Sequence, residues 1–237
     1  MITGTILALT LNEFDGVNKL LRDYTAPAGW RVLVVDGGST DGTLELCDEI
    51  GLDYIIQSEP GVRHAYFSAW EEPLGDYVIS ISPDGNCDLD KIPLIIEKLS
   101  NGYDLVIGSR YLGDSKSEDD DLVTAFGNWV YNRLFLVLFQ FKITDCMVIY
   151  RGYRTNLPND LGLFSNQTYS LYEKLFSTKI SWEPVMSARA AKRSLRISEI
   201  EAGEPKRIGG VRKLQIFRWG FAYLLQFILE ATIRRKE

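Results

Sequence analysis

Short apolar runs alternate with amphipathic stretches along the first half of the chain. The runs are rich in Val, Ile and Leu and are bounded by Gly, Pro, Asn or Asp, which is typical of buried strands. We predict strands at residues 2–11, 31–35, 53–56, 76–81 and 104–108. Between them, apolar residues recur at helical spacing and predict helices at residues 13–24, 43–50, 62–72 and 91–99. This alternation predicts an α/β fold, with a mostly parallel sheet and helices on both of its faces.

The second half contains a long apolar segment at residues 122–141. A helix that spans a membrane needs about 20 mostly apolar residues. Here the run is interrupted by Asn128, Asn132, Arg133 and Gln140. Because an arginine near the centre of a bilayer is costly, we expect that this segment does not span a membrane.

The C-terminal segment, residues 214–233, has an amphipathic pattern. Apolar residues recur at helical spacing at Leu214, Phe217, Phe221, Leu224, Leu225 and Ile228. Trp219 and Tyr223 are types that prefer a membrane interface, and three basic residues follow at 234–236. We expect a helix that lies on an anionic lipid surface. Packing on the protein's own core or in a homodimer, and spanning, are the alternatives. The chain is accordingly divided into a main domain, residues 1–213, and an amphipathic helix, residues 214–237.

The net charge of −6 conceals an uneven distribution. Residues 189–237 hold 12 Lys and Arg against 5 Asp and Glu, which leaves a net charge of +7 there and −13 on residues 1–188. The basic end suits phosphates or anionic lipid, and the acidic part suits solvent or bound cations. The overall acidity argues against a nucleic-acid partner.

The cysteines and the N-terminus bear on the cellular compartment. Cys47, Cys87 and Cys146 lie far apart, in no spacing typical of a disulfide framework or a zinc site. The N-terminus lacks a basic region, and its apolar run meets Asn12 and Glu13 too early for a signal peptide. These features predict a protein of the cytoplasm, or of the cytoplasmic face of a membrane.

Polar residues suited to ligand binding stand where the predicted strands end. The sequence SPDGN at residues 82–86 places Asp84 and Asn86 at the carboxyl end of a strand, where open parallel sheets bind ligands. Their oxygens suit a hard cation or a polar substrate, although Pro-Asp-Gly is also ordinary turn chemistry. Asp36 ends another strand and could accept hydrogen bonds from a base or ribose, or cap a turn. No GxGxxG or GxxxxGK[ST] motif is present, which argues against a dinucleotide or P-loop site.

Five short motifs in the first half, taken in order, resemble the family 2 glycosyltransferases of the GT-A fold. They are LTLNE at 9–13, VVDGGSTDGT at 34–43, GVRHA at 61–65, GD at 75–76 and SPD at 82–84, the last in the place of that family's DxD. The second half looks closest to dolichyl-phosphate mannose synthase and related polyprenyl-phosphate glycosyltransferases. The matching pieces there are IGSRY at 107–111, Asp145 with YRGYR at 150–154, and RIGGVRKL at 207–214.

The resemblance implies a nucleoside-diphosphate sugar as donor and a divalent cation, Mg²⁺ or Mn²⁺, as cofactor. It places Glu13 and Asp36 at the nucleoside and Arg63 near the diphosphate. Asp84 would hold the metal, with Asn86 as a second oxygen ligand. The other residues expected at the nucleotide sugar are Leu9, Ser82, Arg207 and Lys213, the last two as cations that neutralise the leaving diphosphate. On the acceptor side the expected residues are Arg110 and Thr124.

The sequence departs from the family pattern in three places. Ser82 replaces the first acid of the DxD, and Gly37 replaces the second acid after the second strand. The polyprenyl-phosphate enzymes carry an arginine before a serine near the helix that follows strand five. Here that region is the acidic run 118–121, with Thr124 after it. Such a run would repel an acceptor phosphate unless a metal intervened, although four acids in a loop are also typical of a solvated surface.

Glu183 stands where many inverting members of the family keep their catalytic base. Its carboxylate could take the proton from an acceptor hydroxyl, a task that a phosphate acceptor does not require. The alternative is that Glu183 caps a helix at residues 184–193.

These features predict a metal-dependent, inverting glycosyltransferase. Its expected acceptor is a lipid-linked or glycan hydroxyl at a membrane surface. A polyprenyl-phosphate glycosyltransferase and a non-catalytic sugar-nucleotide or membrane-binding module are the alternatives. A sugar nucleotidyltransferase is disfavoured, because residues 9–13 lack the glycine-rich loop which that class carries after strand one.

Overall fold

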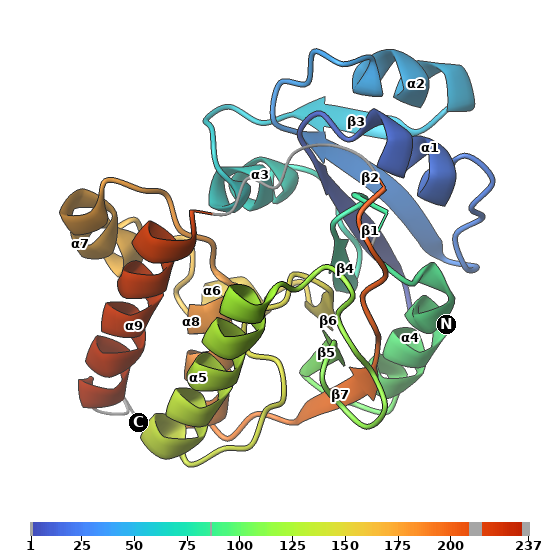
Figure 1. Cartoon of the computed structure of the whole chain (residues 1–237). Coiled ribbons are helices and arrows are strands. Elements are labelled where there is room, and N and C mark those ends of the chain that lie inside the picture. Colours follow the sequence, from blue (N-terminus) through green and yellow to red (C-terminus); the bar gives the residue numbers. More distant parts are fainter. Residues whose placement is uncertain (1, 86, 209–214, 234–237) are drawn as a thin grey trace.

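A computed structural model describes residues 2–85, 87–208 and 215–233 (Figure 1). Its strands are β1 (Gly4–Thr10), β2 (Trp30–Asp36), β3 (Asp53–Ile56), β4 (Tyr77–Ile81), β5 (Leu105–Ser109), β6 (Arg151–Arg154) and β7 (Ile197–Glu201). Its helices are α1 (Phe14–Leu21), α2 (Thr43–Ile50), α3 (Val62–Ala69), α4 (Ile92–Ser100), α5 (Leu122–Phe139), α6 (Leu157–Asp160), α7 (Gln167–Phe176), α8 (Glu183–Lys192) and α9 (Ile216–Thr232). The predicted α/β class is therefore confirmed.

The strands of the described residues form one sheet in the order β3-β2-β1-β4-β6-β5-β7. The pairings of β1 with β2 and β4, of β2 with β3 and of β5 with β7 are parallel. The strand β6 runs antiparallel between β4 and β5. The order reverses at β1, so the carboxyl ends of β1 and β4 meet at an edge where open sheets bind ligands.

The sequence reading missed β6 and β7. Strand β6 carries Arg151 and Arg154 in four residues, a composition that does not resemble a buried strand. Arg151 is nevertheless fully buried, because its guanidinium donates to the backbone oxygens of Val148 and Glu183 and to the Ser187 hydroxyl. Strand β7 has three polar residues among five, without strict alternation, and it borders only β5 in the described sheet.

Helices cover both faces of the sheet (Figure 1). The side chains of Ile6 and Ala8 point to one face, where they pack in a cluster with residues of α1, α2 and α4. Leu7 and Leu9, which alternate with them, point to the other face, which α3, α5, α8 and α9 cover. This alternation follows from the two-residue period of a strand, and it buries β1 completely.

Helix α9 is built into the second layer, where it packs beside α5, α7 and α8 (Figure 1). Phe227 is fully buried, and Glu230 forms an ion pair with Arg189 at 2.6 Å. Phe217 and Phe221 lie on the opposite side of the helix and are exposed. Of the placements predicted for residues 214–233, packing on the protein's own core therefore holds for one face of α9. Residue 214 and the proposed boundary at 213 lie outside the described residues.

Among the described helices, α5 is the one long and apolar enough to cross a membrane by length and composition, and its buried residues are Thr124, Phe135 and Phe139. Its exposed side chains include Leu122, Phe126 and Trp129. The expectation that it does not span a membrane stays a prediction.

Candidate active site

A cavity of about 710 Å³ opens at the carboxyl ends of β1, β4 and β5. Strand ends contribute Leu9, Ser82 and Asp84 to its wall, and α8 contributes Glu183. Its far side is formed by α5 and α9, including Trp219. The cavity thus has charged side chains at the sheet, and the α5 and α9 residues that line it are a mix of apolar and uncharged polar types.

Asp84 is placed by a tight turn after β4. Gly85 has φ +90°, a conformation that favours glycine, and a Cβ there would lie 2.4 Å from Ile208. The Ile208 N–H donates to the Asp84 backbone oxygen at 3.1 Å. The segment that follows β7 therefore lies directly against the turn that carries Asp84.

Arg207, from that same segment, joins the two acids at the polar end of the cavity. Its Nη2 lies 2.6 Å from Asp84 Oδ2, and its Nη1 lies 3.3 Å from Glu13 Oε1. Both acidic side chains are at most 7% exposed. Three residues that are remote in sequence and were predicted at the nucleotide sugar or its metal are thereby brought together, with positive charge held between two carboxylates.

Asp36, which ends β2, has both carboxylate oxygens engaged in a turn. Oδ1 accepts hydrogen bonds from the Gly38 and Ser39 N–H groups, and Oδ2 accepts from the Thr10 and Ser39 hydroxyls. The side chain is fully buried, while the next residue, Gly37, lines the cavity. The turn role considered from sequence is present, and the nucleoside contact stays a prediction.

Arg63 is directed away from this cavity. Its guanidinium donates hydrogen bonds to both carboxylate oxygens of Glu173, at 2.5 and 3.2 Å, and to the backbone oxygen of Ile180. The guanidinium carbon lies 4.1 Å from the centroid of the Tyr169 ring. It lines a separate hollow of about 540 Å³ between α3 and α7. The structure thus gives Arg63 a buried ion pair in place of the diphosphate contact expected from sequence.

Glu183 is the first residue of α8 and is 1% exposed. Its Oε1 accepts a hydrogen bond of 2.6 Å from the Tyr66 hydroxyl, and its side chain lines the cavity. The N-cap position of α8 is held by Trp182, the residue before Glu183, and no side chain makes a capping hydrogen bond there. The acid therefore begins a helix and also faces the cavity that holds Asp84.

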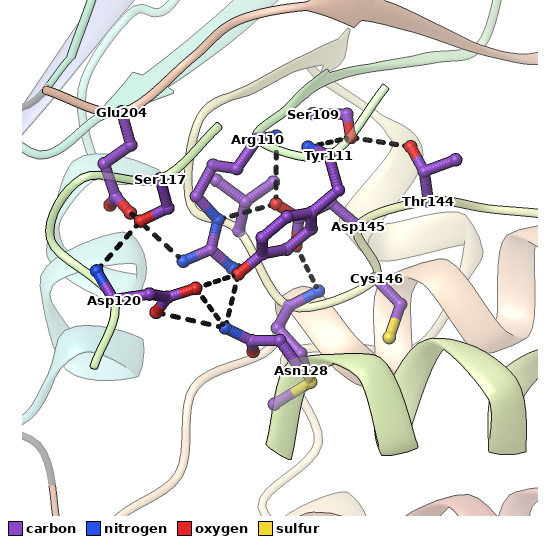
Figure 2. Close-up of polar contacts among 12 residues, drawn as sticks. Ser109, Arg110, Tyr111, Ser117, Asp120, Asn128, Thr144, Asp145, Cys146 and Glu204 are labelled. Carbon is purple, nitrogen blue, oxygen red and sulfur yellow. Dashed lines mark hydrogen bonds and ion pairs between the residues drawn. The ribbon is translucent and has the colours of Figure 1, made fainter. Parts of the chain in front are cut away.

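The wall near β5 carries a polar cluster (Figure 2). Arg110 bonds Asp145 at 2.6 and 3.0 Å and lies 3.5 Å from Glu204. Burial lowers the pKa of Arg110, but Asp145 and Glu204 outweigh it and raise that pKa well above its ordinary value. Burial raises the pKa of Glu204. Arg110 lines the cavity as a cation whose charge is already balanced.

The acidic run at residues 118–121 has two uses in the structure. Asp121 and Thr124 form a reciprocal capping box at the start of α5. Asp120 accepts hydrogen bonds from Tyr111 and Asn128, as Figure 2 shows, and Asp119 and Asp120 line the cavity. The run is therefore part of the cavity wall and is not only a solvated loop.

Glu204 ties this acidic loop to the segment that carries Arg207. Its N–H donates to the Lys116 oxygen at 2.9 Å, and its own oxygen accepts from the Glu118 N–H at 2.7 Å. The Ser117 hydroxyl bonds its carboxylate (Figure 2). One continuous strap, residues 202–208, thus touches both the β5 side and the Asp84 side of the cavity.

Of the other residues predicted at the site, Leu9, Ser82 and Thr124 line the cavity. Asn86 and Lys213 lie outside the described residues. Among those that are described, no three His, Cys, Asp or Glu side chains converge as a metal site.

Comparison with known families decides the class of the protein. Residues 6–162 match the family model for glycosyl transferase family 2, which is more than half of the chain. The chain belongs to glycosyltransferase family 2. The resemblance drawn from its motifs and the predicted enzyme class are therefore confirmed.

Two relatives of this glycosyltransferase come from Haloferax volcanii. The protein is 29% identical over 226 residues to glycosyltransferase AglJ, a match that covers 90% of this chain and 70% of the relative. It is 26% identical over 230 residues to a dolichyl-phosphate hexose transferase, covering 95% and 93% of the two chains.

The glycosyltransferase fold is also found in a solved structure, glucosyl-3-phosphoglycerate synthase from Mycobacterium tuberculosis in complex with Mn²⁺, UDP and glucosyl-3-phosphoglycerate. The TM-score is 0.68 at 15% identity, over 99% of this chain and 82% of the other. At this identity the likeness establishes the fold alone.

Sequence reasoning missed several residues of this glycosyltransferase's cavity region. Tyr66 was not singled out because it stands in an unremarkable helical segment. Glu204 was not singled out because its partner Ser117 lies 87 residues away, and Asn128 was considered only as an interruption of the apolar segment. The spacing of Asp121 and Thr124 could have predicted the capping box.

Proposed function

We propose that this protein transfers a sugar from a nucleoside-diphosphate sugar to an acceptor hydroxyl, with inversion and with the help of a divalent cation. One observation carries the proposal. Asp84, Glu13 and Arg207 meet at the carboxyl edge of the sheet, in the same cavity that Glu183 faces. An acidic pair that accommodates positive charge and a separate carboxylate are the groups this reaction needs.

Asp84 fits a divalent cation by its chemistry. It is a buried carboxylate at a strand end, and its Oδ2 already accepts positive charge from Arg207. Asp84 would hold Mg²⁺ or Mn²⁺ together with the donor diphosphate, and Asn86 is proposed as a second ligand. The bound cation would offset negative charge on the diphosphate. The presence of Mn²⁺ in the structurally similar synthase supports this choice.

The chain's own residues would perform the remaining steps. Glu183 accepts the proton of the acceptor hydroxyl while that oxygen forms a bond to the anomeric carbon. The bond from the anomeric carbon to the diphosphate oxygen breaks with its electron pair, and Arg207, with Lys213, neutralises the leaving group. A single displacement of this kind inverts the anomeric configuration.

The acceptor is proposed to be lipid-linked, because the residues of α5 and α9 that line the cavity are uncharged and include large apolar side chains. Val123 of α5 and Ile216 and Trp219 of α9 line it there. The outer sides of both helices carry exposed apolar side chains, including Phe126, Trp129, Phe217 and Phe221. This surface suits contact with the cytoplasmic face of a membrane. A glycan hydroxyl is the other acceptor of this class, and a homodimer is the other use of the surface.

A polyprenyl phosphate is the second candidate acceptor. The similarity to a dolichyl-phosphate hexose transferase over nearly the whole chain favours it. The charge of the cavity wall opposes it, because Arg110 is balanced by Asp145 and Glu204 and because Asp119 and Asp120 line the same wall. The carboxylates of this wall would repel a phosphate.

The proposal is tested first at the donor. Wild-type protein is titrated calorimetrically with UDP-glucose, UDP-N-acetylglucosamine and GDP-mannose, with MnCl₂ or with EDTA. We expect Mn²⁺-dependent binding of at least one donor. Asp84→Ala should weaken that binding at least tenfold, about 1.4 kcal/mol, because the buried carboxylate is lost.

The matched control is Asp90→Ala, which removes an exposed acid close to the same strand end. It should bind donor as the wild type does. Folded wild-type protein that binds none of the donors would refute the donor proposal. Unchanged Mn²⁺-dependent binding by Asp84→Ala would refute the metal assignment.

A further inference from the structure

Tyr66 of α3 is the side chain that holds the Glu183 carboxylate. It is fully buried, and its hydroxyl donates to Glu183 Oε1 at 2.6 Å. Its ring stacks on Trp182, the residue before Glu183, with centroids 4.2 Å apart and planes at 20°. The hydroxyl is therefore fixed in position by the packing of its own ring.

The backbone of Glu183 is fixed as well. Its carbonyl oxygen accepts hydrogen bonds from Arg151 Nη1 at 3.1 Å and from the Ser187 hydroxyl at 3.0 Å. Within the part of the chain that the structure describes, Oε2 makes no hydrogen bond, and the side chain lines the cavity. One carboxylate oxygen is thus anchored by Tyr66, and the other is available to a group in the cavity.

The phenols around Glu183 keep their protons. Burial, and then the Glu183 carboxylate itself, raises the pKa of Tyr66 well above its ordinary value, so the phenol keeps its proton and remains a donor. Burial also raises the pKa of three phenols on β6, α7 and α9, namely Tyr153, Tyr169 and Tyr223. The cation in contact with the residue is Arg151, which bonds its carbonyl oxygen.

We propose that Tyr66 is a positioning residue for the transfer reaction. Its hydrogen bond orients Glu183 with one oxygen toward the acceptor and stabilises the charged carboxylate that accepts the proton. This inference rests on the proposed role of Glu183 as the base.

The test is Tyr66→Phe, which keeps the ring that packs on Trp182 and removes only the hydroxyl. The readout is kcat/KM for slow hydrolysis of the best-bound donor of the panel above, measured with Mn²⁺ from about pH 5 to 9. The variant removes a hydrogen-bond donor that stabilises the charged carboxylate. We therefore expect the low-pH limb of the kcat/KM profile to move upward by about one pH unit. At a pH below that limb, kcat/KM should be about tenfold lower than in the wild type. The Kd of the donor should be unchanged.

Two variants serve as references. Tyr169→Phe removes another buried hydroxyl, one that bonds the Leu163 backbone oxygen, and it should keep the wild-type profile. Glu183→Gln should lose the acid limb together with most of the activity. Suppose that Glu183→Gln is inactive, but that Tyr66→Phe leaves the limb in place or lowers kcat/KM equally at every pH. Only the inference about Tyr66 would then be overturned. Full activity of Glu183→Gln would overturn the proposed base, and this inference with it.

Discussion

At the scale of single residues, two arginines show how context decides what a side chain does. Arg207 is shared between two acids at the cavity, whereas Arg63 pairs with Glu173 inside the helical layer. Both were expected from sequence to meet the donor's phosphates. The difference lies in tertiary pairing. The buried guanidinium of Arg63 needs a negative partner, and that partner, Glu173, lies 110 residues away in the sequence.

The first prediction at this scale concerns the stability of that pair. Glu173→Gln leaves Arg63 buried without its counter-charge and should lower the free energy of unfolding by about 3 kcal/mol at pH 7. Urea unfolding measures this. The control Glu49→Gln breaks the exposed pair with Arg22 and should change the stability by less than about 1 kcal/mol.

The same pair should depend on pH. Burial acts to raise the pKa of Glu173, but hydrogen bonds from Arg63 and the Ile180 N–H outweigh it and lower that pKa below its ordinary 4.5. A depressed pKa in the folded state contributes stability above the unfolded value, and that stability is lost as the pH falls through the folded value. The difference between wild type and Glu173→Gln should therefore shrink below about pH 4.5. A difference that does not vary with pH would contradict this account.

The residues whose places in the fold could be predicted are those fixed by local geometry. Asp84 follows a buried strand and precedes a glycine with positive φ, so its place at the sheet edge could be predicted from sequence. Glu183 could be placed at a helix start by Pro184. The partners of these acids could not be predicted, because Tyr66 and Arg207 reach them from 117 and 123 residues away.

At the scale of elements, sequence periodicity predicted the strands β1 to β5 and the helices between them. It failed for β6, whose buried arginine is compensated by hydrogen bonds from other elements. It left open whether α9 binds lipid or protein. In the structure one side of α9 packs on α5, α7 and α8, while the other side is exposed.

The exposed sides of α5 and α9 lead to a prediction about lipid. Phe126 and Trp129 are 64% and 56% exposed. Replacing both with Ser should weaken co-sedimentation with phosphatidylglycerol vesicles at least tenfold. Burial of each apolar side chain is worth about 1.5–3 kcal/mol. Thermal unfolding should be unaffected, since neither ring is in the core. Leu94→Ser alters an exposed apolar residue of α4 and should sediment as the wild type does. Undiminished sedimentation of the double variant would count against the proposed membrane surface.

At the scale of the whole molecule, the sheet joins two layers whose helices do different work. The layer of α1, α2 and α4 buries one face of the strands. The layer of α3, α5, α8 and α9 buries the other face and also closes the cavity. The C-terminal helix is thus part of the core as well as part of the site.

This arrangement predicts that α9 unfolds together with the rest of the protein. Phe227→Ala empties a fully buried position packed on Phe135 and Phe139, and it should cost about 4 kcal/mol and lower the Tm by on the order of 10 °C. Differential scanning calorimetry should still show one transition. Phe217→Ala, on the exposed side of the same helix, should leave the Tm almost unchanged. Two transitions, or an unshifted Tm for Phe227→Ala, would show that α9 behaves as a separate unit.

The strap at residues 202–208 links the two halves of the cavity. Glu204 fastens it to the acidic loop, and Arg207, three residues later, fastens it to Asp84. If the diphosphate of a bound donor replaced Asp84 as the partner of Arg207, the strap would move. The acidic loop that Glu204 contacts would then move with it. Filling one half of the cavity would then change the shape of the other, so the affinity for the acceptor should depend on whether the sugar nucleotide is bound.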